Sequence, residues 1–155
     1  MKFVVTGGLG FIGSCLVNKL LKLNHEICII DRRDISLAIE NNPLISSWIH
    51  HFTSSNPIYK LVNSDIADID LSFLSGYDVI VHLAANPGVQ LSVSNPLQDL
   101  QANLLNTIKV LESLRNIDIG SRPSLIFSSS AAPLAGNDLR PHLVVFFCEQ
   151  LDQLP

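Results

Sequence analysis

Apolar residues along the chain follow two patterns that alternate from the amino end to residue 127. The first pattern is a short continuous run, which predicts buried strands at residues 2–5, 26–30, 59–62, 78–83 and 124–127. The second is helical spacing, which predicts long helices at residues 11–23 and 97–115. Apolar strands that alternate with helices are typical of a parallel sheet with both faces covered.

The alternation therefore predicts an α/β fold, a Rossmann-type doubly wound parallel sheet. Right-handed crossovers would place its switch point between the first and fourth strands. Residues 34–57 depart from the pattern, because Pro43, Pro57 and several Asn and Ser residues interrupt the apolar spacing. For that segment we expect one short helix and irregular chain, with Trp48 either in the core or anchored at the surface.

The alternation ends after Gly136. Residues 137–155 hold an apolar run at residues 143–148 and a polar, Gln-rich end, but no helical spacing of the kind that should follow a fifth strand. We therefore predict a partial domain at residues 1–136, truncated after about the fifth strand, and an atypical tail at residues 137–155. A sheet face left without its helix, together with the apolar run, predicts self-association or aggregation.

A glycine-rich segment, TGGLGFIG, lies between the first expected strand and the first expected helix. Gly7 allows a tight turn off the strand, Gly10 removes a side chain that would block phosphates, and Gly13 lets the helix pack closely. The helix start at Phe11 and Ile12 offers unpaired N–H groups and the positive end of its dipole to an anion. The segment predicts binding of a dinucleotide pyrophosphate, with a tight structural turn as the alternative.

Three charged residues follow the second expected strand. Asp31 lies eighteen positions after Gly13, where a carboxylate can accept hydrogen bonds from the adenosine ribose and would repel a 2′-phosphate. Arg32 and Arg33 complicate the choice, because an arginine in this place can instead pair with that phosphate. We therefore expect NAD as the cofactor, with NADP less favoured; the alternative to a cofactor site is a solvated loop of mixed charge.

Composition narrows the function classes. With 155 residues, 47% of them hydrophobic, the chain can bury the core of one domain. A net charge of −4 argues against a nucleic-acid-binding surface, and no apolar run approaches membrane-spanning length. The cysteines, Cys15, Cys28 and Cys148, match neither a metal site nor a disulfide framework. We expect a cytoplasmic protein without metal, nucleic-acid or membrane partners.

The histidines predict no separate site. His50 and His51 are adjacent, so their side chains would point apart on a helix or strand, and a solvated loop is favoured over a metal pair. His82, within the fourth expected strand, is best explained as a packed and hydrogen-bonded residue.

Several motifs, in matching order, resemble those of the NAD-dependent epimerase/dehydratase family, part of the extended short-chain dehydrogenase/reductase superfamily that acts on nucleotide-activated sugars. The matching segments are the glycine turn at residues 6–13, Asp65-Ile66, Val81-His82-Leu83-Ala84-Ala85, Ser94-Asn95-Pro96 with Asn103 and Thr107, and Phe127-Ser128-Ser129-Ser130. The resemblance covers about residues 1–136.

The resemblance implies an NAD(P)-binding domain at residues 1–136 and a nucleoside-diphosphate sugar as the substrate of the complete enzyme. Ser130 would be a catalytic hydrogen-bonding residue, Asp65 and Ile66 would meet the adenine, and residues 83–85 would line the cofactor. The whole implied cofactor set is Gly7, Gly10, Phe11, Ile12, Gly13, Asp31, Arg32, Asp65, Ile66, Leu83, Ala84, Ala85 and Asn103.

The sequence also departs from the family pattern. The family's helix-entry motif is N-x-x-G-T, which matches residues 103–107 except that Asn106 stands at the glycine position. The aromatic of the family's V-Y-G turn is also missing after Ser130. The family's Tyr-x-x-x-Lys pair, a general acid/base tyrosine and a lysine that lowers its pKa, is absent too. The only tyrosines are Tyr59 and Tyr77, and no lysine follows Lys109. We therefore expect at most trace turnover from this chain.

Two hypotheses follow from this combination of motifs and departures. The first is the NAD(P)-binding part of a nucleotide-sugar epimerase/dehydratase, inactive or nearly so as this chain, and a gene fragment or frameshifted product. The second is a stand-alone dinucleotide-binding or regulatory module without catalysis. A homodimer is compatible with both.

Overall fold

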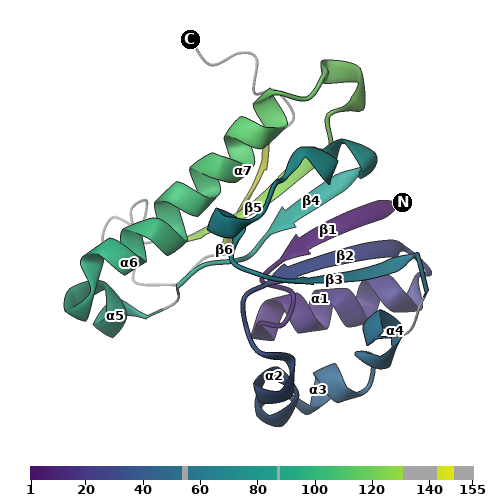
Figure 1. Cartoon of the computed structure of the whole chain (residues 1–155), viewed down its shortest axis with the longest axis horizontal. Coiled ribbons are helices and arrows are strands. Elements are labelled where there is room, and N and C mark those ends of the chain that lie inside the picture. Colours follow the sequence, from purple (N-terminus) through teal and green to yellow (C-terminus); the bar gives the residue numbers. More distant parts are fainter. Residues whose placement is uncertain (54–55, 87, 131–142, 149–155) are drawn as a thin grey trace.

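The computed structural model describes residues 1–53, 56–86, 88–130 and 143–148 (Figure 1). The strands are β1 (Lys2–Thr6), β2 (Glu26–Asp31), β3 (Tyr59–Asn63), β4 (Val79–His82), β5 (Ser124–Ser130) and β6 (Leu143–Cys148). The helices are α1 (Phe11–Lys22), α2 (Ile35–Asn41), α3 (Pro43–Ser46), α4 (His50–Thr53), α5 (Val89–Ser94), α6 (Pro96–Leu100) and α7 (Asn106–Arg115), with a π-helical segment, η3 (Gln101–Leu105), between the last two. Short 3₁₀ turns lie at η1 (Ile66–Asp68), η2 (Ser72–Gly76) and η4 (Ile119–Ser121).

The order of the strands confirms the predicted topology. The sheet runs β3-β2-β1-β4-β5-β6, and its first five strands in chain order pair in parallel. The chain therefore builds outward from β1 to β3 and then returns past β1 to β4. Ligands of such sheets bind where the order reverses, outside the carboxyl ends of the strands.

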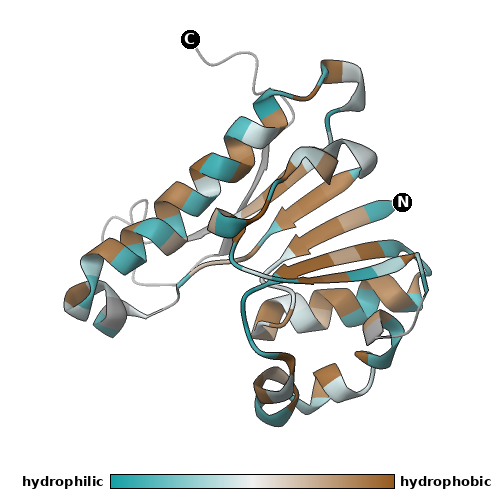
Figure 2. Ribbon diagram, viewed as in Figure 1, coloured by the Kyte–Doolittle hydropathy of each residue, from teal (hydrophilic) through white to brown (hydrophobic). Residues whose placement is uncertain are grey.

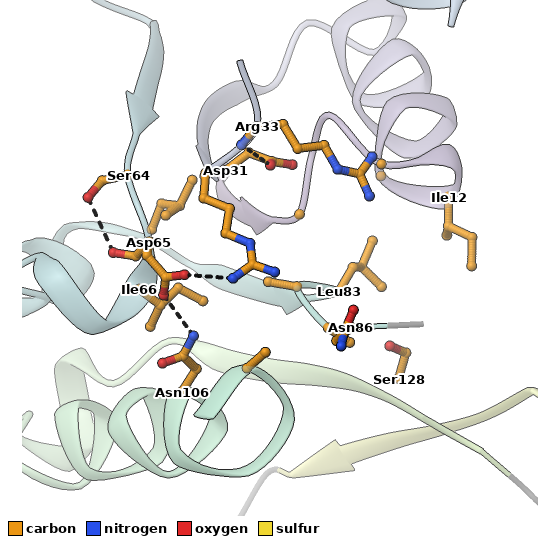
Figure 3. Close-up of a pocket in the computed structure, with 18 of the residues that line it drawn as sticks. Ile12, Asp31, Arg33, Ser64, Asp65, Ile66, Leu83, Asn86, Asn106 and Ser128 are labelled. Carbon is orange, nitrogen blue, oxygen red and sulfur yellow. Dashed lines mark hydrogen bonds and ion pairs between the residues drawn. The ribbon is translucent and has the colours of Figure 1, made fainter. Parts of the chain in front are cut away.

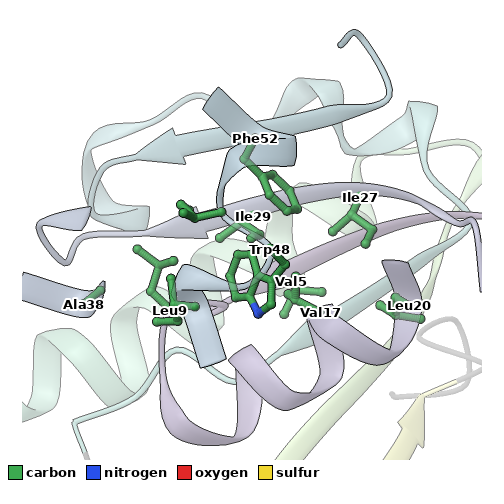
Figure 4. Packing of buried hydrophobic residues seen from close by; sticks show 11 residues of the cluster. Val5, Leu9, Val17, Leu20, Ile27, Ile29, Ala38, Trp48 and Phe52 are labelled. Carbon is green, nitrogen blue, oxygen red and sulfur yellow. The ribbon is translucent and has the colours of Figure 1, made fainter. Parts of the chain in front are cut away.

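Apolar layers cover both faces of the sheet, because successive residues of a strand face opposite sides. On β1, Val5 packs into one layer with Val17 of α1 and Trp48 (Figure 4). Its neighbour Val4 packs into the other layer with Leu114 of α7. Figure 2 shows the apolar strands of the sheet between these helices. Trp48 is only 2% exposed and so belongs to the core, the first of its two predicted places.

Residues 35–53 form three short helices, so the prediction of one short helix with irregular chain was wrong. The residues that interrupt the apolar spacing start helices here. The side chain of Asp34 caps α2 by accepting hydrogen bonds from two backbone N–H groups. The side chain of Asn42 caps α3 in the same way, and Pro43 takes the first position of that helix, where its missing N–H costs nothing.

The long helix predicted at residues 97–115 is confirmed as the continuous run of α6, η3 and α7. It begins at Pro96, where the side chain of Asn95 accepts a hydrogen bond from the N–H of Gln98 at 3.2 Å. Its inner face buries Val110 and Leu114. In the part of the chain that the structure describes, this helix and the others are all too short or too polar to cross a bilayer.

The apolar run at residues 143–148 forms β6, an element that the sequence analysis did not assign. β6 pairs antiparallel with β5, from Leu125 opposite Cys148 to Ser130 opposite Leu143. The parallel part of the sheet ends with β5, as predicted. The division of the chain at residue 136 and its self-association stay predictions.

We expect Leu114→Ala to lower the free energy of unfolding by about 2–5 kcal/mol. The Leu114 side chain is 0% exposed, so its truncation leaves a cavity in the core. Ile119→Ala, at a side chain of η4 that is 73% exposed, is the control and should change the free energy of unfolding by less than about 0.5 kcal/mol. Urea unfolding of the two variants measures the difference; equal losses would contradict the layer of core assigned to α7.

Candidate functional site

A cavity of about 440 Å³ lies outside the carboxyl ends of β1, β2 and β4, at the reversal of the strand order (Figure 3). Twelve of the thirteen predicted cofactor residues line it: Gly7, Gly10, Phe11, Ile12, Gly13, Asp31, Arg32, Asp65, Ile66, Leu83, Ala84 and Ala85. The thirteenth, Asn103, lies just behind the lining. The structure thus brings the twelve lining residues together from four separate segments of the sequence.

The glycine turn lies very close to the backbone that follows β4. Gly7 has a φ of +71°, a left-handed conformation that disfavours other residues, and a Cβ there would lie 2.8 Å from the backbone nitrogen of Ala84. A Cβ on Gly13 would collide with the carbonyl oxygen of Gly7 and the Cα of Gly8. The structure differs from the predicted packing of the helix against the sheet at Gly13, because the close contact that requires a glycine there is made with the turn itself.

The start of α1 offers an anion site to the cavity. Its N-cap is Gly10, which has no side chain to accept hydrogen bonds from the first N–H groups of the helix. No acidic residue lies in the first turn, whereas Lys19 and Lys22 lie in the last one. The positive end of the helix dipole is therefore directed at the cavity without a competing carboxylate of the helix.

Asp31 and Arg33 bind the backbone of Leu9, in the glycine turn, through the two successive peptide groups that flank this residue. Asp31 is 6% exposed; its Oδ2 accepts the N–H of Leu9 at 2.9 Å, and its Oδ1 accepts the N–H of Arg33 at 2.9 Å. The Arg33 guanidinium donates from Nη1 to the carbonyl oxygen of Leu9 at 3.1 Å. A carboxylate has about four acceptor positions, so Asp31 can still accept ribose hydroxyls.

Asp65 lies immediately before η1, as the N-cap residue of that turn, and three donors converge on its carboxylate. Its Oδ1 accepts the N–H of Ala67 at 3.0 Å and Nδ2 of Asn106 at 2.8 Å, and its Oδ2 pairs with Nη1 of Arg32 at 3.1 Å. Burial by itself raises the pKa of Asp65, but these hydrogen bonds and the Arg32 charge outweigh it and lower the pKa below its usual value. Asp65 is therefore ionised at neutral pH.

His82 confirms the expectation of a packed and hydrogen-bonded residue. The hydroxyl oxygen of Thr6 accepts the N–H groups of Leu83 and Ala84, at 3.2 and 3.1 Å, so its proton is directed at Nδ1 of His82, 2.8 Å away. The other ring nitrogen, Nε2, then donates to the hydroxyl oxygen of Thr107 at 3.1 Å. This chain of hydrogen bonds ties β1 and β4 to α7 beneath the cavity.

The same arrangement keeps the imidazole neutral. His82 is 2% exposed, and burial lowers its pKa from 6.5 to about 4. A charged ring would also turn Nδ1 into a donor facing the Thr6 hydroxyl and break the chain. His82 is therefore a neutral, structural residue beneath the cavity at neutral pH.

Asn103 supports the loop that follows β4. Its Oδ1 accepts the N–H of Asn86 at 2.6 Å, and its Nδ2 donates to Asp99 at 2.9 Å. Asn86 lines the cavity, so Asn103 acts on the lining through it. A direct contact between Asn103 and a cofactor stays a prediction.

The cavity also contacts residues that the sequence analysis assigned to no site, among them Ser64, Asn86, Asn106 and Ser128. Asn106 carries a signal that could have been recognised, since it replaces the glycine of the helix-entry motif and its amide reaches Asp65. Ser128 donates weakly to the carbonyl oxygen of His82 at 3.5 Å. The side chain of Ser130 lies outside the described part of the chain, so its catalytic role stays a prediction.

Neither tyrosine reaches the cavity. Tyr59 is the first residue of β3, and Tyr77 lies two residues before β4. Both are therefore at the amino edge of the sheet, whereas the cavity lies at the carboxyl edge. Among the described residues, no cluster of His, Cys, Asp and Glu could hold a metal ion.

A sequence model of the NAD dependent epimerase/dehydratase family matches residues 3–142. The chain belongs to this family. The match includes the glycine turn, the residues after β3 and β4, and the long helix, which are the motifs on which the resemblance rests.

Individual proteins and solved structures are also similar to most of this chain. A putative UDP-glucose 4-epimerase of Methanocaldococcus jannaschii is 36% identical over 136 residues, which are 86% of this chain and 39% of that protein. The solved structure of a UDP-N-acetylglucosamine 4-epimerase from Methanobrevibacter ruminantium, in complex with UDP-N-acetylmuramic acid, is similar with a TM-score of 0.67 and 31% identity, over 91% of this chain and 41% of that one.

A further similar structure was solved with NAD bound. A UDP-glucose-4-epimerase from Stenotrophomonas maltophila, with bound NAD and formylated UDP-arabinopyranose, has a TM-score of 0.66 and 27% identity, over 90% of this chain and 40% of that one. The chain therefore spans about two fifths of the length of these relatives.

We expect Gly13→Ala to destabilise the protein by about 1–3 kcal/mol, because its Cβ meets backbone atoms of the glycine turn that cannot give way. Gly120→Ala is the matched control, since a Cβ there meets nothing within 4 Å, and it should be neutral or slightly stabilising. Thermal and urea unfolding measure both. A Gly13→Ala protein as stable as the control would refute the close packing.

The pKa of His82 predicts a loss of stability in acid. The folded chain binds this proton with a pKa of about 4 and the unfolded chain with an ordinary pKa near 6.5, so the unfolded state is favoured increasingly as the pH falls between those values. The free energy of unfolding should drop by about 3 kcal/mol more in the wild type than in His82→Gln between pH 7 and pH 4. Parallel curves for the two proteins in urea titrations would contradict the assignment.

Proposed function

We propose that this chain is the NAD-binding part of a nucleotide-sugar epimerase/dehydratase. The observation that carries the proposal is the uncapped start of α1 beside the glycine turn, facing a cavity whose other wall holds Asp31 and Asp65. Backbone N–H groups of the first helical turn suit a pyrophosphate. A buried carboxylate at the end of β2 suits the ribose hydroxyls. Membership of the family and the NAD bound to a relative support the same cofactor.

Each part of the cavity has a task in holding the dinucleotide. The N–H groups at Phe11 and Ile12 bind the pyrophosphate, and Asp31 accepts the ribose hydroxyls. Ile66 supplies an apolar wall for the adenine, next to Asp65. The nicotinamide end then lies toward Ala85 and the carboxyl end of β5. NAD, when bound, supplies the hydride acceptor for transient oxidation of a sugar carbon.

The charges around Asp31 favour NAD over NADP. The Arg33 guanidinium is engaged with the carbonyl of Leu9, and that of Arg32 with Asp65. A 2′-phosphate would therefore meet the Asp31 carboxylate without a free arginine partner.

Catalysis by the chain on its own is expected to be at most a trace. General acid–base catalysis typically contributes about 10²–10⁴-fold, and the 155 residues hold no Tyr-x-x-x-Lys pair to supply it. Ser130, at the end of β5, is proposed to hydrogen-bond the reacting sugar oxygen of a nucleoside-diphosphate sugar. A dinucleotide-binding or regulatory module without catalysis is the second candidate, favoured by the position of both tyrosines at the amino edge of the sheet.

The chain is further proposed to be cytoplasmic and to form a homodimer. The homodimer would cover apolar side chains that α6, η3 and α7 leave exposed, which are Leu97, Leu100, Leu104, Leu105 and Ile108.

Titration of the purified chain with NADH in a calorimeter tests the cofactor site, with one saturable site per chain as the expected result. Ile12→Asp should weaken binding at least about tenfold, because it places a negative charge beside the pyrophosphate. The same charge stabilises a helix N-terminus, so this variant should not lose stability. Ile12→Asn, which has the same shape without the charge, is the matched control.

Absence of saturable NADH binding to the wild type would overturn the proposed function. Equal NADH affinities of Ile12→Asp and Ile12→Asn would contradict a pyrophosphate site at the start of α1. Turnover of UDP-glucose, followed by NADH absorbance and product chromatography in the same samples, separates the catalytic candidate from the binding module.

A further inference from the structure

Two arginines border the adenosine half of the cavity, and their surroundings differ. Arg33 bends toward the glycine turn, where its Nη1 donates to the carbonyl oxygen of Leu9 at 3.1 Å. It is thus part of the scaffold that holds the turn. Arg32 points across the cavity toward η1, and its only charged partner among the described residues is Asp65.

The Arg32–Asp65 pair joins the end of β2 to the start of η1. Nη1 of Arg32 lies 3.1 Å from Oδ2 of Asp65, and their side chains are 48% and 23% exposed. Asp65 cannot swing away with Arg32, since its Oδ1 is fixed by the N–H of Ala67 and the amide of Asn106. The carboxylate therefore determines where the guanidinium rests.

We propose that Asp65 selects NAD over NADP by holding the Arg32 guanidinium in an ion pair and so denying it to a 2′-phosphate. The inference rests on the proposed cofactor site and adds to it a residue that sets its specificity. A 2′-phosphate would have to separate Arg32 from Asp65 and would then lie near two carboxylates, those of Asp65 and Asp31. The ribose of NAD, with a neutral 2′-hydroxyl, meets neither obstacle.

The substitution Asp65→Asn isolates this effect. An asparagine retains one oxygen, which can keep the two hydrogen bonds that Oδ1 accepts from Ala67 and Asn106. It replaces only Oδ2, the atom that faces Arg32, with an NH₂ group. Arg32 then loses its partner while the start of η1 keeps its cap.

The experiment is calorimetric titration of the wild type, Asp65→Asn and Asp65→Asn/Arg32→Gln with NADH and with NADPH. The ratio of the NADPH to the NADH dissociation constant should fall at least about tenfold in Asp65→Asn, because the released guanidinium forms a charge-assisted hydrogen bond to the 2′-phosphate. The double variant should lose this gain. Arg32→Gln alone should leave the ratio close to the wild-type value, because a guanidinium held by Asp65 makes no contact with the 2′-phosphate; this exposed position also provides a test if Asp65→Asn is poorly folded.

An unchanged ratio in Asp65→Asn, or a gain that survives removal of Arg32, would overturn the inference while NADH binding by the wild type still supports the cofactor site. A higher ratio in Arg32→Gln than in the wild type would overturn it as well, because Arg32 would then already bind the 2′-phosphate in the wild type. Failure of the wild type to bind either dinucleotide would remove the proposed function, and this inference with it.

Discussion

The cavity depends on how closely the glycine turn approaches the carboxyl ends of β1 and β4. Gly7, in a left-handed conformation, lies against the backbone of Ala84 with no room for a Cβ. Thr6, one residue earlier, binds the N–H groups of Leu83 and Ala84 with its hydroxyl. Because the two segments are locked together, the start of α1 is held at a fixed place outside the sheet, and the anion site of the helix faces the switch point.

Charged groups at the end of β2 serve both the fold and the proposed ligand. Asp31 is buried, and it uses part of its capacity to accept hydrogen bonds on the peptide N–H of Leu9. Arg33 donates to the carbonyl oxygen of the same residue, which belongs to the next peptide group. A cofactor carboxylate that also supports the phosphate-binding turn couples the ribose end of the site to its pyrophosphate end. This coupling explains why the aspartate can remain nearly excluded from solvent, since its charge is hydrogen-bonded before any ligand arrives.

The described part of the chain forms the proposed dinucleotide site, and its His82 and two tyrosines are not placed for proton-transfer chemistry there. His82 lies under the cavity, but burial and its two threonine partners keep it neutral, so it serves as a brace between β1, β4 and α7. Tyr59 and Tyr77 lie at the opposite edge of the sheet. The relatives are more than twice as long as this chain.

The sequence by itself determined the parallel α/β topology, the switch point and most of the cavity lining, because apolar periodicity and glycine spacing are local signals. It did not reveal the three helices at residues 35–53, two of which start at the capping side chains of Asp34 and Asn42, nor the pairing of β6 with β5. Only the tertiary structure decided what each charged residue contacts. Arg32 and Arg33 are adjacent and chemically identical, yet one pairs with Asp65, 33 positions away, and the other with Leu9. Such pairings depend on which strand ends meet in space, and neither composition nor spacing along the chain carries that information.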